Sequence, residues 1–280
     1  MRGLLSINSY AHSDVCGIIV SLLMAHIISV VNQKGGVGKT TTALNLAAFL
    51  ASAGKFILLV DLDPQANATS GVGIDHKTLP AGVYEGLVGT HSMRNLIHPT
   101  DHEGLSILPA TQALAGASVE LVNAEEREHF LRKALLEVRN DYDYIFIDNP
   151  PSLGMLTING LVAADSVLIP VQAEYFALEG LSQLLNTVNL VRDNLKPDLE
   201  VMGAVITMYD GRTRLSKEVL EELYRYFPDK IFRSVIPRSI RLAEAPSFGK
   251  TILGYDPASK AAKAYERLAR EFLLREEGRI

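Results

Sequence analysis

A glycine-rich loop with two lysines stands near the start of the chain, in the order Lys34-Gly-Gly-Val-Gly-Lys-Thr-Thr-Thr42. It follows an apolar run at residues 27–31 and opens a helical run at residues 40–52. Backbone amides that converge at a helix N-terminus bind anions, a lysine at the loop's end reaches the outer phosphates, and the first hydroxyl is placed to ligate Mg²⁺. The loop therefore predicts a nucleotide site in which Lys39 binds phosphate and Thr40 binds the metal.

Two further apolar runs end in acidic residues. Asp61 and Asp63 follow residues 56–60, and Asp148 ends the run that begins at residue 142. Open α/β sheets place their ligand chemistry at the carboxyl ends of strands. Alternation along the strand end would point Asp61 and Asp63 to the same side, toward the nucleotide. We interpret Asp148 as the acid that acts on Mg²⁺ through a coordinated water.

The elements that must position these residues alternate along the chain. Apolar runs predict strands, and runs with helical periodicity predict helices between them. The expected strands are at residues 27–31, 56–60, 105–109, 142–148, 166–171, 201–208 and 231–236. The expected helices are at residues 40–52, 83–88, 93–97, 114–123, 127–139, 178–193, 216–226 and 259–276. This order predicts a single doubly wound α/β domain, with a mostly parallel sheet and helices on both faces.

Composition limits the alternatives. The chain has 280 residues, of which 48% are hydrophobic, so one large domain with a substantial core is expected. The only cysteine, Cys16, excludes an intrachain disulfide and a C-x-x-C metal site, which favours a reducing cytoplasm. The net charge of −5 argues against a globally basic nucleic-acid binder, although residues 201–250 hold nine Lys and Arg against six acids.

The N-terminus needs a separate interpretation. Residues 17–24 are apolar, but a spanning helix needs about 20 apolar residues, and here His26 and Asn32 interrupt a run that continues into the first strand. We therefore expect no membrane segment. Residues 1–23 are interpreted as a poorly ordered extension or a mis-assigned start, and residues 24–280 as the domain proper.

The motifs together resemble one family. The phosphate loop and residues 60–70, 148–152, 170–180, 207–213 and 236–246 are similar to the ParA/Soj family of chromosome- and plasmid-partition ATPases. The loop itself resembles the deviant Walker A motif of SIMIBI-class P-loop NTPases. Asn149 departs from the family pattern, where cysteine, threonine or serine is commoner, but Asp148 is kept.

The resemblance implies ATP and Mg²⁺ as cofactors and a set of contacts. The nucleotide would be bound by Lys34, Gly35, Gly36, Val37, Gly38, Lys39, Thr40 and Thr41, with Asp63 orienting the attacking water and Thr207 and Pro237 at the adenine. The second lysine, Lys34, would reach across a dimer interface to the partner's nucleotide. Lys34, Lys39 and Asp63 are thus the predicted catalytic residues, and Thr40 and Asp148 the predicted metal-binding ones.

The resemblance also implies a cycle. ATP would drive formation of a sandwich homodimer that binds DNA without sequence preference, and a ParB-type partner would stimulate an otherwise weak hydrolysis and release the DNA. Arg212 and Arg241 stand where relatives place arginines that contact the DNA backbone. A cytoplasmic, nucleoid-associated protein is expected.

Three other functions are weighed against this one. A MinD-like membrane-positioning ATPase would end in a basic amphipathic helix, whereas residues 270–280 are balanced in charge. A nitrogenase-reductase-like electron carrier would need cysteines to bridge a cluster, and Cys16 lies outside the predicted domain. A nucleotide-gated scaffold with negligible turnover remains open.

Overall fold

The structure is a computed structural model that describes residues 24–121, 124–174 and 177–278. The extension expected at residues 1–23 lies outside the described residues. Among the described helices, none is both long and apolar enough to cross a membrane.

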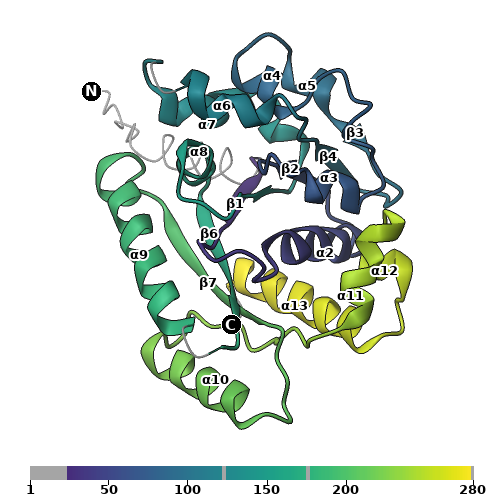
Figure 1. Cartoon of the computed structure of the whole chain (residues 1–280), viewed down its shortest axis with the longest axis vertical. Coiled ribbons are helices and arrows are strands. Elements are labelled where there is room, and N and C mark those ends of the chain that lie inside the picture. The colour runs from purple at the N-terminus through teal and green to yellow at the C-terminus, as the bar shows by residue number, and fades with distance from the viewer. Residues whose placement is uncertain (1–23, 122–123, 175–176, 279–280) are drawn as a thin grey trace, which may run out of the picture.

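One sheet of seven strands organises the molecule (Figure 1), in the order β3-β4-β2-β5-β1-β6-β7. Every neighbouring pair is parallel except β3 and β4. The strands are β1 (His26–Val30), β2 (Ile57–Asp61), β3 (His98–Pro99), β4 (Leu105–Leu108), β5 (Tyr144–Asp148), β6 (Ser166–Gln172) and β7 (Glu200–Thr207). The predicted mostly parallel α/β sheet is confirmed.

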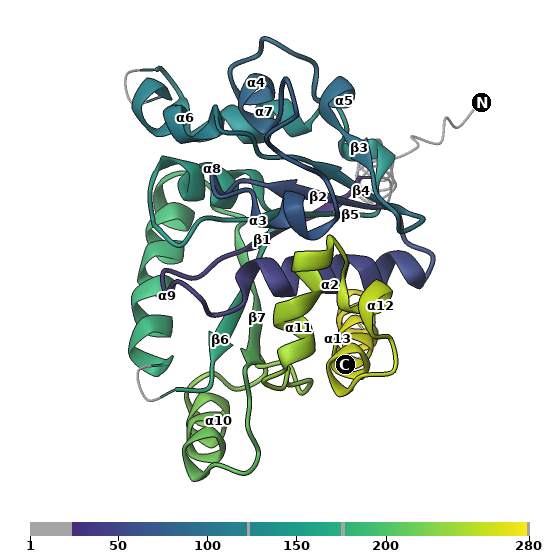
Figure 2. The same cartoon turned by 45° about the vertical axis from the view of Figure 1, so that its right-hand side comes forward.

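Helices cover both faces of this sheet. The α-helices are α2 (Lys39–Ser52), α3 (Asn67–Gly71), α4 (Val83–Leu87), α5 (Met93–Leu96), α6 (Leu114–Glu120), α7 (Phe130–Leu135), α8 (Met155–Ala163), α9 (Ala177–Asn194), α10 (Arg214–Tyr226), α11 (Ile240–Glu244), α12 (Ile252–Tyr255) and α13 (Lys260–Glu276). Short 3₁₀ turns are η2 (Arg127–His129), η3 (Arg139–Asp141) and η4 (Ala245–Phe248). Figure 2 shows α2 and α13 on one side of the sheet, with α4, α6 and α7 on the other.

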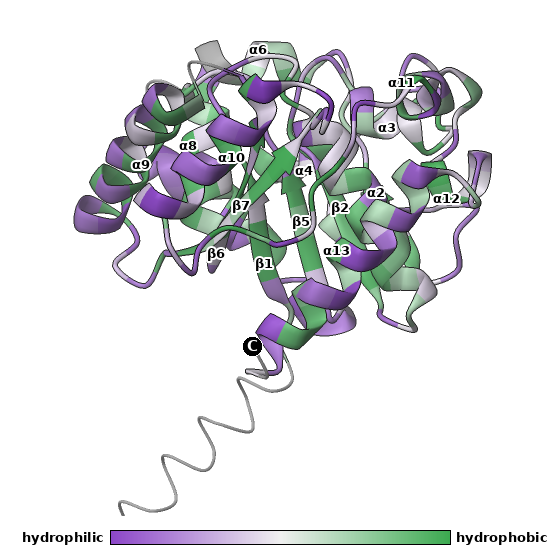
Figure 3. Ribbon diagram, turned by 90° about the horizontal axis from the view of Figure 1, so that it is seen from below, coloured by the Kyte–Doolittle hydropathy of each residue, from purple (hydrophilic) through white to green (hydrophobic). Residues whose placement is uncertain are grey.

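The strands are apolar on both faces because both faces are covered. In β1 and β5, Ile28 and Phe146 pack with α2 and α13, while Ile27 and Ile145 join the core on the opposite face. Seen from below (Figure 3), hydrophobic strands lie between helices whose outer surfaces are largely hydrophilic. This two-sided burial explains the uninterrupted apolar runs of the sequence.

The strand expected at residues 231–236 is wrong. This segment and the next residue meet the sheet edge at two isolated bridges, Ala204 with Ile231 and Tyr209 with Pro237, and the Ile236 amide donates to the Ile206 carbonyl at 2.8 Å. The backbone amides of Arg233 and Ser234 donate instead to the Glu271 carboxylate, at 2.7 and 2.8 Å. Amides that bond a side chain cannot extend a β ladder, so β7 remains the last regular strand.

Other elements differ from expectation in length or number. The helix expected at residues 127–139 is broken into η2, α7 and η3, and the one expected at residues 114–123 is described only as α6, because residues 122–123 lie outside the described part. Helices α3, α8, α11 and α12 were not predicted. α8 is apolar almost all round and three of these helices are four or five residues long, so none has the amphipathic stripe that periodicity detects.

The last long helix is part of the core. On α13, Ala264, Tyr265, Leu268 and Phe272 are buried against the α2 face of the sheet. Phe272 meets Tyr144 of β5 edge to face, with ring centroids 5.2 Å apart. The apolar stripe of α13 is therefore occupied by intramolecular packing.

Candidate nucleotide site

The glycine-rich loop joins β1 to α2 at the carboxyl edge of the sheet. Gly36 and Gly38 have φ of 75° and 88°, a left-handed conformation that side chains disfavour. Gly38 is the N-cap of α2, and its carbonyl accepts the first helical bond from Thr42. The loop thus leads straight into the N-terminus of a long helix, the arrangement that binds phosphate groups.

A cavity of about 580 Å³ opens beside this loop. Its loop wall is formed by Gly36, Gly38, Lys39, Thr40 and Thr41. Asp63 and Gln65 line it after β2, and Asn45 lines it from α2. The remaining wall comes from Pro151, Met208 and the α11 and η4 region, including Leu242, Pro246 and Lys250. A site of this size accommodates a nucleotide.

Lys39 is held inside the site. Its side chain is buried, and its ammonium donates to the carbonyl of Lys34 at 3.3 Å, so the lysine folds back along its own loop. Burial lowers the pKa of Lys39, and the charges of Asp148 and then Asp63 oppose that shift. A desolvated cation that faces a loop of amides suits the binding of phosphate oxygens.

Asp148 is fully buried, and neither of its carboxylate oxygens has a hydrogen-bond partner among the described residues. Burial raises its pKa well above the ordinary value and the charge of Asp61 adds to the rise. The nearby Thr40 hydroxyl lowers the pKa of Asp148, although it is not placed to donate a well-formed hydrogen bond to either carboxylate oxygen. An unsatisfied carboxylate beside a hydroxyl fits a divalent cation, whose charge would reverse this penalty.

The protein supplies few ligands for that cation. No group of three or more His, Cys, Asp or Glu side chains among residues 24–121, 124–174 and 177–278 could hold a metal. Mg²⁺ is commonly bound by one or two protein oxygens together with phosphate oxygens and waters. Thr40 and Asp148 fit that pattern, in which the metal arrives with a nucleotide.

The two acids after β2 have different surroundings. Asp63 lines the cavity, and its carboxylate accepts the amide of Gln65 at 3.0 Å. Asp61 is fully buried and accepts two bonds from Thr69, from the amide at 2.8 Å and the hydroxyl at 2.7 Å. Asp61 therefore fixes α3 in place and does not line the cavity, so the expectation that both acids face the nucleotide is wrong for Asp61.

Lys34 lies outside the residues that line the cavity. Its amide donates to Asn32, and its half-exposed side chain forms an ion pair with Glu174, in the segment after β6. Within this chain, the ammonium therefore points to a carboxylate.

The two residues expected at the adenine do not line the cavity either. The Thr207 hydroxyl donates to the Val37 carbonyl at 2.8 Å, which ties the end of β7 to the phosphate loop. Pro237 bridges to Tyr209 at the sheet edge.

Sequence reasoning missed the wall formed by residues 242–250, because α11 and η4 are too short to show periodicity. It also missed Asn45, whose side chain donates to the Thr41 carbonyl and accepts the amide of Ile252. A buried asparagine in the middle of an apolar helix was the available signal.

The two arginines expected to contact DNA are exposed and paired within the chain. Arg212 lies against Asp210, and Arg241 against Glu244 and Asp256.

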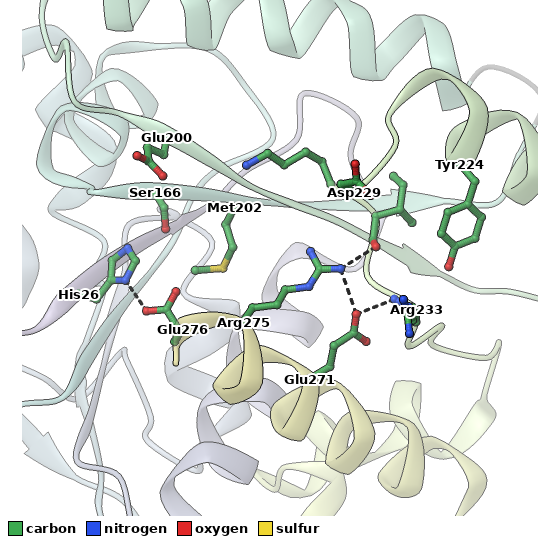
Figure 4. A pocket seen from close by; sticks show the side chains of 12 residues that line it. His26, Ser166, Glu200, Met202, Tyr224, Asp229, Arg233, Glu271, Arg275 and Glu276 are labelled. Carbon is green, nitrogen blue, oxygen red and sulfur yellow. Dashed lines mark hydrogen bonds and ion pairs between the residues drawn. The ribbon is translucent and has the colours of Figure 1, made fainter. Parts of the chain in front are cut away.

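A second cavity, of about 610 Å³, lies where β1, β6 and β7 begin (Figure 4). His26 pairs there with Glu276, and Arg275 donates to the Ile231 carbonyl and to Glu271. None of its lining residues belongs to the phosphate loop, and ligand chemistry in open α/β sheets lies at the opposite edge. We assign these contacts to the attachment of α13 to the sheet.

The sheet order, the glycine-rich loop and the strand-end acids define a P-loop nucleotide-binding protein of the α/β class. A family model described as "AAA domain" matches residues 25–201. The chain is 56% identical over 248 residues to the sporulation initiation inhibitor protein Soj of Bacillus subtilis, covering 89% of this chain and 98% of that one. It is 52% identical to the chromosome partitioning protein ParA of Myxococcus xanthus over 253 residues, covering 90% and 89%. The chain belongs to the ParA/Soj family of chromosome-partitioning ATPases.

Solved structures agree with this fold. A structure named cobyrinic acid a,c-diamide synthase from Mycobacterium smegmatis, with a bound ATP analogue and magnesium, has a TM-score of 0.80 at 38% identity, covering 90% of this chain and 96% of that one. A putative plasmid partition protein from Borrelia burgdorferi bound to AMPPNP has a TM-score of 0.76 at 29% identity, covering 90% and 99%. The cell division ATPase MinD of Pyrococcus furiosus has a TM-score of 0.73 at 26% identity, covering 89% and 99%.

Proposed function

We propose that this ATPase forms an ATP-dependent sandwich dimer that binds DNA without sequence preference and releases it when a ParB-type partner stimulates hydrolysis. The observation that carries the nucleotide chemistry is the unpartnered, buried Asp148 carboxylate next to Lys39 and Thr40. Neither Lys39 nor Thr40 gives the Asp148 carboxylate a hydrogen bond. Mg²⁺ and the phosphates of ATP would complete the site.

The proposed roles follow from where the groups lie. Amides of residues 35–41 would cradle the phosphates, and Lys39, now bonded to the Lys34 carbonyl, would bind a phosphate oxygen. Thr40 and Asp148 would hold the metal. Bound Mg²⁺ would neutralise charge on the transferring phosphoryl group. Asp63 lies at the cavity wall with one oxygen on the Gln65 amide, and its other oxygen would orient the attacking water.

The dimer is needed for the second lysine. In this chain Lys34 pairs with Glu174, outside the cavity, so a role on its own nucleotide has no support. We propose that Lys34 leaves Glu174 and reaches the partner's phosphates, where its charge offsets that of the transition state.

The remaining assignments rest on family resemblance. Thr207 and Pro237 would hold the adenine, and Thr207 would do so while it supports the loop at Val37. Arg212 and Arg241 would contact DNA phosphates, and the protein would act in the cytoplasm on the nucleoid.

Turnover measurements test the proposal. ATP hydrolysis is measured for the protein alone, with duplex DNA, and with DNA and the ParB-type partner from the same genome. Hydrolysis that rises only with DNA and partner supports the proposed cycle. Negligible turnover under all conditions would favour a nucleotide-gated scaffold, and ATP-dependent sedimentation with liposomes would favour a MinD-like role.

A further inference from the structure

Two chain segments form a joint surface beside the nucleotide cavity. Residues 209–214 and 237–241 are joined by the bridge between Tyr209 and Pro237, and the Arg238 amide donates to the Tyr209 carbonyl at 3.1 Å. Together they expose four arginines, which we call the arginine surface: Arg212, Arg214, Arg238 and Arg241.

The first of these arginines is held by a carboxylate two residues away. The Arg212 guanidinium donates from Nε to Asp210 Oδ1 at 2.9 Å and from its terminal nitrogen to Oδ2 at 2.7 Å. The Arg212 amide adds a third bond to the same carboxylate, at 3.1 Å. These bonds lower the pKa of Asp210 to about 2, with a smaller contribution from the charge of Arg238.

Two other arginines are also paired with carboxylates, each through single contacts. Arg241 donates to Glu244 at 3.2 Å and lies 3.6 Å from Asp256, and Arg214 donates to Glu218 at 2.6 Å. Three of the four arginines thus face carboxylates, while the charge of Arg238 acts on Asp210. The four arginines and the four carboxylates of Asp210, Glu218, Glu244 and Asp256 cancel in charge. This balance is consistent with the acidic net charge of the chain.

A bidentate carboxylate presents the same acceptor geometry to a guanidinium as a phosphate does. Exposed ion pairs of this kind are weak and exchange readily, whereas duplex DNA offers a dense row of phosphates and releases counterions when they are neutralised. We propose that Asp210 and Glu244 set the DNA affinity of the arginine surface by occupying its guanidinium groups until DNA phosphates displace them. The inference rests on the proposed DNA binding and adds the competing residues.

Removing a competing carboxylate should strengthen DNA binding. Asp210→Asn and Glu244→Gln each keep the hydrogen-bonding shape and remove one negative charge, so we expect a gain in affinity of about two- to fivefold each at low salt. The probe is a fluorescent duplex of random sequence, measured by anisotropy against the nucleotide-free protein and the ATP-bound protein. The gain should shrink as salt rises, because screening weakens the pairs and the phosphate contacts alike.

Glu266→Gln is the matched control, because Glu266 is exposed on α13, outside the two segments, and its loss changes the net charge equally. Gains confined to residues 210 and 244 support the proposal, and melting curves check that each variant is folded. If the parent binds DNA and neither variant binds more tightly than Glu266→Gln, the competition is refuted. If neither parent nor variants bind DNA in any nucleotide state, the proposed DNA binding itself fails.

Discussion

Asp61 and Asp148 are register partners across β2 and β5, and both carboxyl groups are fully buried. Thr69 satisfies Asp61 with two hydrogen bonds, while Asp148 receives none among the described residues. Burial raises the pKa of Asp61 to about 6 and raises that of Asp148 well above its ordinary value, and the charge of Asp61 adds to the rise at Asp148. A buried carboxylate without a hydrogen-bond partner, beside a second buried acid, is electrostatically costly, and a cation that enters with a nucleotide would relieve this cost.

Replacing Asp148 should therefore separate stability from function. Asp148→Asn removes a buried charge without changing the side-chain shape, so we expect the free energy of unfolding of the nucleotide-free protein to rise by about 1–2 kcal/mol. The same change should abolish the extra thermal stabilisation given by Mg²⁺ with ATP over ATP alone. Thermal melts with and without Mg²⁺ measure both effects. Asp101→Asn, at an exposed position, is the control, and an unchanged Mg²⁺ effect in Asp148→Asn would remove Asp148 from the metal site.

Asp63 tests the proposed chemistry directly. Asp63→Ala should keep ATP binding and dimerisation but lower hydrolysis by at least ~10²-fold, as expected when a water-orienting group is lost. Turnover under single-turnover conditions, together with nucleotide affinity by calorimetry, distinguishes chemistry from binding. A variant that hydrolyses ATP at the parental rate would show that another group orients the water.

The two lysines of the loop should respond differently. Lys39→Ala should abolish tight ATP binding, because the buried ammonium lies at the phosphate cavity. Lys34→Ala should spare binding and impair only the turnover that depends on the dimer, because this side chain lies with Glu174 outside the cavity. Calorimetry and light scattering in ATP measure the two properties. Equal loss of nucleotide affinity in both variants would exclude the role of Lys34 across the interface.

The acidic partner of Arg212 gives a pH-dependent prediction. Asp210 has a pKa lowered from 3.8 to about 2, chiefly by its hydrogen bonds to Arg212. A lowered pKa in the folded state means that this pair contributes stability above pH 4 and loses it as the pH falls from about 4 to 2. In Arg212→Ala, the pKa of Asp210 should return toward 4, and NMR titration of the carboxyl carbon measures it. A pKa near 4 in the parent protein would mean that the pair does not form in solution.

The sequence signals at the phosphate-loop end of the molecule are local. The loop needs glycines at φ values that other residues disfavour, and the acids must follow buried strands, so Gly38 and Asp148 could be read from spacing alone. The resemblance adds what spacing does not carry, including the proposed role of Lys34 across a dimer interface.

What the sequence did not predict depends on contacts between distant residues. The segment at 231–236 has the apolar pattern of a strand, yet Glu271, about 40 residues away, takes the amides that a ladder would need. The cavity wall at Leu242 and Pro246 comes from helices of one turn, which carry no periodic signal. The environment of Asp61 depends on Thr69, whose position follows from α3 rather than from alternation along β2.

The last prediction concerns the dependence of DNA binding on the dimer. α11 carries Arg241 on the surface while its neighbours Leu242 and Ala243 line the nucleotide cavity, so one short helix contacts both the proposed DNA face and the ATP site. If the ATP dimer places two arginine surfaces along one DNA duplex, the number of neutralised phosphates doubles. A plot of the logarithm of DNA affinity against the logarithm of salt concentration should have a slope of about −0.9 per neutralised phosphate. The slope should therefore be nearly twice as steep for the dimer as for the monomer.

DNA affinity is measured at several salt concentrations for two samples. One is the dimer locked with a non-hydrolysable ATP analogue, and the other is the nucleotide-free monomer. Arg241→Glu should eliminate binding by the dimer, because it removes one cation from each copy and places like charge against the phosphates. Light scattering in the ATP analogue should still detect the dimer of this variant, since Arg241 is exposed and lies outside the phosphate loop. A salt-independent affinity, or equal affinity of monomer and dimer, would show that ATP does not act by bringing two arginine surfaces together.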